Sequence, residues 1–373
     1  MEIETVVVGA GFVGLAVGLE LASRGAEVLL LEQHCSVGAE TSSRNSEVLH
    51  VGLYSPKSWL KTKLCLEGKN KLSTFCLENK VPLHHCGKLI VATSEGEIAK
   101  LKNLHSQALE NGIQDIEWIN SKRASELEPQ LTCFGALYSP STALVDSTSL
   151  LIALENSFKT NKGVLSLQTK LVNIEVVNNG EFKLIMNYLP SLSTETLKCK
   201  NLILATGLHA TQTANLLVRH LKCPVPETRF AKGHYYVLKK ENPFSHLIYP
   251  LPSDAGLGIH FTLSLLGQPK FGPDVEWSRT PSVKFDHTNE KRLLNFVSSI
   301  QKYWPVIQEE MLEPGYVGVR PRLYPEGELP ADFAIHGPEH HGVSNLVVLY
   351  GIESPGLTSC LGIGAYVADI LKR

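Results

Sequence analysis

The sequence of residues 3–14, IETVVVGAGFVG, decides the fold of this chain. Its first six residues form an apolar, partly β-branched run without glycine or proline, which is typical of a buried strand. The apolar residues that follow the glycines predict a helix, which ends at Gly25 because glycine commonly lies just beyond a helix C-terminus. Residues 26–31, AEVLLL, predict a second buried strand. The order strand, glycine-rich turn, helix and strand indicates a dinucleotide-binding unit.

Each glycine of the motif has its own physical role. Gly9 permits the tight turn from strand to helix, and Gly11 lets a pyrophosphate approach the free N–H groups at the helix start. Gly14 lets the helix pack closely on the strand. Glu32 follows eighteen residues later and can accept hydrogen bonds from a ribose, whereas its charge would repel a 2′-phosphate. The motif therefore predicts a site for FAD or NAD, and the alternative is a glycine-rich turn that binds nothing.

Length and composition narrow the function classes. The chain has 373 residues, which is more than one hydrophobic core usually holds, so we expect two domains. A formal net charge of −2 gives no general attraction to nucleic acid. No run of about 20 apolar residues occurs, so no transmembrane segment is predicted. Eight cysteines without a CxxC motif are typical of reduced thiols in an intracellular protein, and no metal site is expected.

A polar loop, residues 40–46, follows the second predicted strand. The hydroxyls of Ser43 and Ser46 can donate hydrogen bonds to a pyrophosphate or to a flavin ring, and so can the amide of Asn45. Arg44 can offset phosphate charge. The alternative is a solvated loop without a ligand.

A third buried strand is predicted at residues 200–205, and a turn of small residues follows it. Ala205 and Gly207 would let the backbone pass close to an adenosine, although an ordinary strand end has the same composition. An antiparallel hairpin is predicted around residues 178–180. Apolar spacing predicts helices at residues 59–79, 95–111 and 290–303, and one that starts near residue 147.

Short strands separated by glycine, proline and aspartate predict an antiparallel sheet late in the chain. They are expected at residues 235–238, 247–251, 258–263 and 275–277. The chain then returns to a buried strand, a glycine-rich turn and a helix, at residues 346–350, 351–362 and 361–371.

Five stretches resemble one family, and the resemblance covers nearly the whole chain. They are residues 42–54, 63–65, 86–92, 258–262 and 351–359. They are similar to FAD-dependent oxidoreductases of the D-amino-acid oxidase superfamily and, more narrowly, to the L-2-hydroxyglutarate dehydrogenases. The resemblance implies an α/β fold of the D-amino-acid oxidase type, in which a Rossmann-like FAD-binding domain carries an inserted antiparallel-sheet substrate domain. The sequence departs from the family at Glu47, where glycine is more usual, and in the short segment 267–280.

The resemblance also divides the chain into consecutive segments. The FAD-binding domain would take residues 1–86, 145–223 and 324–373, and the substrate domain would take residues 87–144 and 224–323. In the family, the backbone at Val172 contacts the adenine, while Gly356, Leu357 and Thr358 approach the isoalloxazine. Backbone N–H groups at such a turn can stabilise negative charge on a reduced flavin.

The expected chemistry follows from the same resemblance. No second G-x-G-x-x-G motif follows a strand, so no separate NAD(P) site is predicted. The resemblance implies oxidation of a small hydroxy-dicarboxylic acid, (S)-2-hydroxyglutarate, to 2-oxoglutarate by hydride transfer to flavin N5. The electrons would leave to oxygen, a quinone or another electron carrier. Because an alcohol ionises only far above neutral pH, a base must take the hydroxyl proton as the hydride leaves.

Histidine has the intrinsic pKa that such a base needs. His50 is the first candidate and His260 the second, and each lies on a family-like stretch. A structural or flavin-contacting role is the alternative for His50, with a covalent flavin link as a lesser one. A structural role in the sheet is the alternative for His260. Arg320 is the candidate for binding one substrate carboxylate, with Arg44 as the alternative.

Two other functions stay open. One is an amine or amino-acid oxidase that acts on glycine, sarcosine or a D-amino acid. The other is a flavin-bound assembly factor without turnover. Eukaryotic relatives are mitochondrial, which favours that compartment, whereas a strand that begins at residue 3 leaves no room for a visible presequence and favours the cytoplasm.

Overall fold

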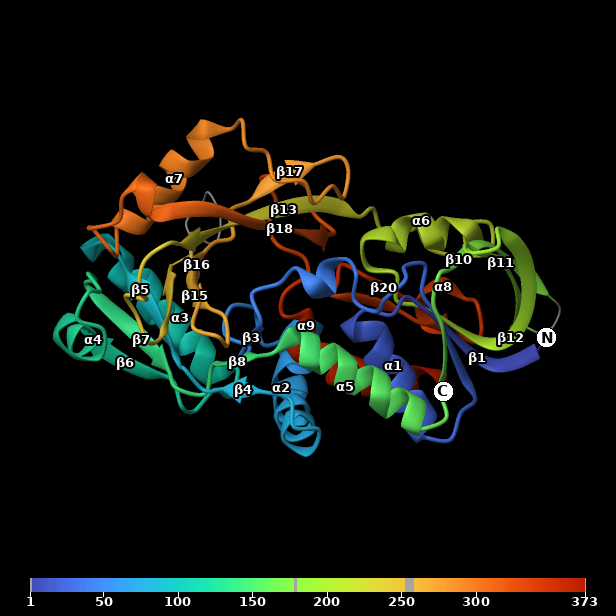
Figure 1. The fold of residues 1–373 in the computed structure, drawn as a ribbon. Coiled ribbons are helices and arrows are strands. Elements are labelled where there is room, and N and C mark those ends of the chain that lie inside the picture. The colour runs from blue at the N-terminus through green and yellow to red at the C-terminus, as the bar shows by residue number, and fades with distance from the viewer. Residues whose placement is uncertain (1, 178–179, 252–257, 373) are drawn as a thin grey trace.

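The computed structural model describes residues 2–177, 180–251 and 258–372, which form two large sheets, a small third sheet and the helices around them (Figure 1). In the eight-stranded sheet, β1 (Glu2–Val8) lies between β2 (Val28–Leu31) and β12 (Ser193–Leu204), and the three are parallel. Val6 and Val7, which point to opposite faces, are both fully buried, so this sheet is covered on both sides as its apolar strands predict.

The other strands of this sheet extend it in both directions. β9 pairs with β2 and β20 with β12, both parallel, while β10, β11 and β12 form an antiparallel series. The predicted hairpin is confirmed by the β10–β11 pairing, and residues 178–179 of its turn lie outside the described residues. The bounds are β9 (Val164–Ser166), β10 (Thr169–Val177), β11 (Glu181–Tyr188), β19 (Ala334–His336) and β20 (Leu346–Tyr350).

Four helices pack beside this sheet and bring distant parts of the sequence together (Figure 1). The helix α1 (Phe12–Ser23) contacts α5 (Ser147–Thr160) and α9 (Gly356–Leu371), and α9 also contacts α2 (Leu60–Glu78). Asp146 caps α5, because its carboxylate accepts a hydrogen bond of 2.8 Å from the backbone N–H of Ser149. The contact between α1 and α9 places the end of the chain beside the glycine motif.

The nine-stranded sheet lies on the other side of the molecule (Figure 1). Toward one end of this sheet, β13 (Arg229–Leu238) pairs antiparallel with β18 (Leu312–Arg322). The helices of this part of the molecule are α3 (Ile98–Glu110), α4 (Ser121–Leu127) and α7 (Glu290–Gln301). The remaining strands are β5 (Lys88–Ala92), β6 (Glu117–Asn120), β7 (Gly135–Ser139), β14 (Leu247–Pro250), β15 (Phe261–Leu263), β16 (Pro269–Phe271) and β17 (Glu276–Ser278).

The remaining elements of the described chain are short. The three-stranded sheet contains β3 (Val48–Leu49), β8 (Ala143–Val145) and β4 (Leu83–His84). Two short helices are α6 (Ala210–Ala214) and α8 (Pro338–His341). Single 3₁₀ turns occupy Thr41–Ser43, Glu95–Glu97, Gly207–His209, Asn215–Leu217 and Glu309–Met311. In the described ranges, no helix has the length and apolarity that a membrane crossing requires.

Three sequence-based expectations need correction. The strand expected from residue 258 begins only at Phe261. The second sheet is mostly antiparallel, but β14 runs parallel to β5, which a distant segment of the chain contributes. The glycine-rich turn expected at residues 351–362 is helical from Gly356 onward, since small residues let α9 approach α1 and α2 closely. Glycine content alone did not distinguish such a tightly packed helix from a turn.

Candidate functional site

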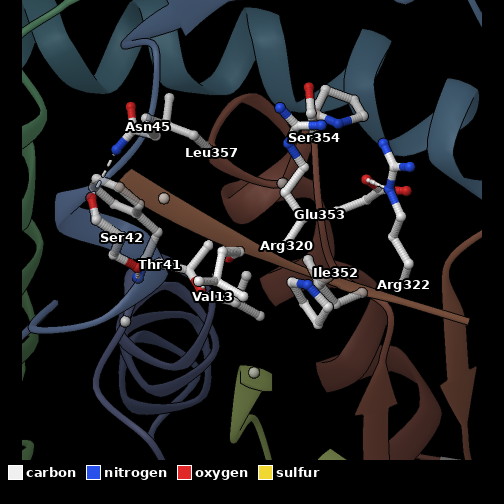
Figure 2. Close-up of a pocket in the computed structure, with 18 of the residues that line it drawn as sticks. Val13, Thr41, Ser42, Asn45, Arg320, Arg322, Ile352, Glu353, Ser354 and Leu357 are labelled. Carbon is white, nitrogen blue, oxygen red and sulfur yellow. Dashed lines mark hydrogen bonds and ion pairs between the residues drawn. The ribbon is translucent and has the colours of Figure 1, made fainter. Parts of the chain in front are cut away.

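Residues from both large sheets line a cavity of about 1360 Å³. Pockets for a single small molecule usually hold about 300–1,000 Å³, so this cavity has room for a large cofactor together with a substrate. Figure 2 shows part of its wall, with Ser42 and Asn45 on one side and Arg320 and Glu353 on the other.

The glycine motif forms one end of the cavity. A Cβ atom on Gly14 would lie 1.7 Å from the Gly9 carbonyl oxygen, and one on Gly9 would lie 2.5 Å from the Ala205 carbonyl oxygen. No side chain fits at either position. Gly11 is the N-cap of α1, so the helix presents its first backbone N–H groups at the cavity wall. This cradle fits the pyrophosphate of a dinucleotide such as FAD.

Glu32 also lines the cavity, where its side chain is held by backbone donors. Its Oε2 accepts a hydrogen bond of 2.8 Å from the N–H of Ala10, and its Oε1 accepts one of 2.9 Å from the N–H of His34. Each carboxylate oxygen can accept more than one bond, so Glu32 keeps acceptor capacity for a ribose. Ala205 and Gly207, whose backbone is predicted to pass close to an adenosine, also line the cavity.

Most of the predicted polar loop lines the cavity as well. Arg44, Asn45 and Ser46 do so, and Asn45 is oriented by a 2.7 Å hydrogen bond from its Nδ2 to the Ser42 carbonyl. Ser43 is exposed and does not line the cavity, because its hydroxyl donates to carbonyl oxygens within the loop. Ser42 takes that place, and its Oγ accepts a 3.1 Å bond from the N–H of Phe12 at the start of α1. The sequence contained no signal that separates these two neighbouring serines.

Two further predicted residues lie off the cavity wall. Val172 is 41% exposed on β10, and its neighbour Leu171 lines the cavity instead. Thr358 is fully buried behind the wall, where its Oγ1 accepts a 2.9 Å bond from the N–H of His50 and donates to the Val48 carbonyl. Gly356 and Leu357, which precede it, do line the cavity.

His50 and His260 both line the cavity, in different settings. The Nε2 atom of His50 lies 3.4 Å from the Ser354 hydroxyl. Burial lowers the pKa of His50 to about 3, and the charges of Lys88 and His260 contribute to that shift. His260 stacks on Tyr249, with ring centroids 3.7 Å apart and an angle of 9° between the planes. His50 is therefore a neutral imidazole at pH 7.

Arg320 and Arg322 differ in their partners. The Nη1 atom of Arg320 is buried at the cavity and has no hydrogen-bond partner within the described residues. Arg322 is paired, since its Nε lies 3.2 Å from the Glu353 carboxylate, which also lies 3.7 Å from Lys61 Nζ. Figure 2 shows Arg320 and Arg322 beside the segment that contains Glu353 and Ser354. Arg320 is thus the arginine of this pair with an unused donor.

Sequence reasoning missed Lys88 as a site residue. Lys88 lines the cavity from the start of β5 and is fully buried, and its Nζ has no hydrogen-bond partner in the described part of the chain. Burial lowers its pKa to about 8. A signal was present, because a lysine at the start of the apolar strand KLIVA is an unusual choice.

Glu47, the departure from the family pattern, also lies on the cavity wall. Its φ of 62° is in the left-handed region, which explains why glycine suits this position. The carboxylate accepts a 2.8 Å bond from Ser147 and lies 3.5 Å from Lys270 Nζ. These contacts hold a strained backbone position that a glycine would adopt freely.

Comparison with known proteins agrees with this geometry. Over its full length, the chain is 41% identical to the mitochondrial L-2-hydroxyglutarate dehydrogenase of Arabidopsis thaliana and covers 84% of that protein. It is 29% identical to the L-2-hydroxyglutarate dehydrogenase of Indibacter alkaliphilus, with both chains covered completely.

A solved structure shares the fold. The chain resembles the FAD-bound L-α-glycerophosphate oxidase of Mycoplasma pneumoniae with a TM-score of 0.87 and 23% identity, over 100% of this chain and 95% of that one. Residues 4–370 match the family model described as FAD dependent oxidoreductase. With a cradle that fits a dinucleotide and a match along almost its whole length, this chain belongs to the family of FAD-dependent oxidoreductases.

Proposed function

We propose that this enzyme oxidises (S)-2-hydroxyglutarate to 2-oxoglutarate. The observation that carries the proposal is a neutral His50 on the wall of a cavity that Arg320 also lines, where the Nη1 atom of Arg320 has no hydrogen-bond partner among the described residues. A base and a cation are what a 2-hydroxy acid needs for its hydroxyl and its carboxylate. The names of the Arabidopsis and Indibacter relatives support the same substrate.

The cofactor site would use the residues at the glycine end of the cavity. The α1 N-terminus and its glycines Gly9, Gly11 and Gly14 would hold the pyrophosphate, and Glu32 would hold the ribose. Among the predicted residues that line the cavity, Ala205, Gly207, Gly356 and Leu357 would add backbone contacts, and Arg44, Asn45 and Ser46 would add polar contacts. The contacts expected from Ser43, Val172 and Thr358 would instead come from their neighbours Ser42, Leu171 and Leu357, which line the cavity. When bound, FAD supplies an acceptor for two electrons.

The reacting end would use His50 as the base. Its imidazole is unprotonated at neutral pH, so Nε2 can take the substrate hydroxyl proton as the C2 hydrogen leaves with its electron pair. The backbone bond to Thr358 holds His50 in place. His260 is the second candidate, and its stack on Tyr249 also suits it to fixing the position of that ring. Arg320 would bind one substrate carboxylate.

The proposed function also assigns each segment of the chain to one of two domains. Residues 87–144 and 224–323 would form the substrate domain, and residues 1–86, 145–223 and 324–373 the FAD-binding domain. Electrons would pass to oxygen, a quinone or another carrier. We also propose a mitochondrial location, because the Arabidopsis relative is named as mitochondrial.

Anaerobic titration of the purified flavoprotein tests the proposal. We expect (S)-2-hydroxyglutarate to bleach the flavin absorbance with stoichiometric formation of 2-oxoglutarate, and the R enantiomer to leave it unchanged. Bleaching by glycine, sarcosine or a D-amino acid, with no response to the hydroxy acid, would instead identify an amino-acid oxidase. A yellow protein that none of these compounds reduces would favour the assembly factor.

A further inference from the structure

Lys88 is a buried cation whose Nζ has no oxygen ligand among the described residues. Its Nζ lies 5.3 Å from the centroid of the Tyr54 ring and 5.0 Å from that of Tyr249. Ring faces attract a cation, but they leave the three N–H donors of an ammonium group without acceptors. All three side chains line the cavity.

No counter-ion compensates this charge in the described residues. The titratable groups whose charges act on Lys88 are the thiols of Cys65 and Cys86 and the ammonium of Lys69. Burial raises the pKa of Cys65 to about 12 and that of Cys86 to about 11, so both thiols are neutral at pH 7. An isolated buried charge is strongly destabilising, so its presence on a cavity wall points to an anion that enters from outside.

A second unused donor lies next to Lys88. The Tyr54 hydroxyl is buried and has no hydrogen-bond partner within the described residues, and the Tyr54 ring is the one beneath Lys88 Nζ. An ammonium and a phenol hydroxyl together can bind both oxygens of one carboxylate.

The position of Lys88 differs from that of Arg320. Arg320 lies on β18, and Figure 2 shows it beside the segment that contains Glu353 and Ser354. Lys88 lies on β5, another strand of the second sheet. Tyr249 lies near both cations. Lys88 Nζ lies over its ring, and the positive charge of Arg320 acts on the pKa of its hydroxyl. His50 lies within reach of both regions, with Ser354 at its Nε2 and the charge of Lys88 acting on its ring.

We propose that Lys88, together with the Tyr54 hydroxyl, binds the carboxylate remote from the oxidised carbon and thereby selects dicarboxylic 2-hydroxy acids. This inference rests on the proposed function, in which Arg320 binds one substrate carboxylate, and it takes that carboxylate to be the one next to the oxidised carbon. Lys88 is then the residue that distinguishes 2-hydroxyglutarate from 2-hydroxypentanoate, which has the same carbon chain without the second carboxylate.

The test compares Lys88→Met with wild type on these two substrates. Loss of a charged hydrogen bond predicts a rise in KM for 2-hydroxyglutarate on the order of 10–100-fold in Lys88→Met. The constant kcat/KM for 2-hydroxypentanoate should change less than about threefold, so that the preference for the dicarboxylate is lost. Tyr54→Phe should show the same pattern with a smaller change, and Lys88→Arg should retain much of the preference.

Lys69→Met is the matched control. It removes a nearby positive charge that donates a 2.6 Å bond to Ser141 and does not line the cavity, so the substrate preference should persist. Lys88→Met should fold, with a melting temperature at least as high as that of wild type, because it removes an uncompensated buried charge. An unchanged preference in Lys88→Met, or an equal loss on both substrates, would overturn the assignment.

A binding measurement separates this inference from the proposed function. Glutarate and pentanoate cannot be oxidised at C2 in the same way, and their binding to the FAD-loaded enzyme can be followed by flavin absorbance or calorimetry. We expect wild type to bind glutarate more tightly and Lys88→Met to lose that difference. If wild type oxidises no hydroxy acid, the proposed function fails, while the glutarate comparison still decides whether Lys88 binds a carboxylate.

Discussion

The Oγ1 atom of Thr358 accepts a hydrogen bond of 2.9 Å from the backbone N–H of His50, although 308 residues separate them in the sequence. The same hydroxyl donates to the Val48 carbonyl at 3.3 Å. The last helix of the chain therefore fixes the backbone of the short segment that carries the candidate base. Thr358 is a positioning residue, since it lies behind the cavity wall and acts through His50.

We expect Thr358→Val to lower kcat by roughly tenfold with little change in KM, because a displaced base disturbs the reaction more than substrate binding. Steady-state kinetics with (S)-2-hydroxyglutarate measure this. Thr358→Ser, which restores the hydroxyl, should recover most of the rate. A Thr358→Val enzyme with wild-type kcat would show that the bond does not position His50.

His50→Gln should reduce kcat on the order of 10²–10⁴-fold, the usual contribution of a general base, without loss of bound flavin. His260→Gln should have a smaller effect, below about tenfold, because it removes a ring stack on Tyr249 and leaves the base intact. Stopped-flow measurement of flavin reduction compares the two variants directly. The reverse order of effects would assign the base to His260.

The pH dependence of kcat/KM should reflect two groups whose pKa values are lowered, His50 and Lys88. The pKa of His50 is lowered to about 3, so this base is already unprotonated from pH 6 to 7.5, and the rate should be flat there. The pKa of Lys88 is lowered to about 8, so the ammonium loses its proton and its charge as the pH rises through that value. Dicarboxylate oxidation should therefore fall above pH 8. In Lys88→Arg, kcat/KM should no longer fall above pH 8, since arginine stays charged. A fall that persists unchanged in this variant would show that another group causes it.

Gly14→Ala should abolish FAD binding or folding, because the new Cβ would lie 1.7 Å from the Gly9 carbonyl oxygen. Gly96→Ala is the matched control, since among the described residues no heavy atom beyond its chain neighbours lies within 4 Å of the position of its Cβ. The absorbance ratio of flavin to protein after purification reports cofactor content. A yellow Gly14→Ala protein with wild-type stability would contradict the close packing of α1 on the glycine turn.

The sequence by itself determined the dinucleotide unit, because every step there is local. A buried strand needs apolar residues, the turn needs Gly9, and the approach of α1 needs Gly14, so spacing alone predicted this unit. The family-like motifs predicted the overall fold and FAD. The cap of α5 is also a local feature, because Asp146 binds the N–H of a residue only three positions further along the chain. These features concern residues that are neighbours along the chain.

Only the tertiary structure decided which side chains face the cavity and which lack partners. Ser42 and Ser43 are equivalent in sequence, and the loop conformation alone turns Ser42 to the wall. Arg320 and Arg322 are separated by one residue, yet only Arg322 meets Glu353. Lys88 became a site residue when folding placed Tyr54 and Tyr249 beside it, with no carboxylate bonded to its Nζ in the described part of the chain. Burial and the charges of distant segments determine which of these groups face the cavity and which lack partners. A local sequence pattern contains no information about either.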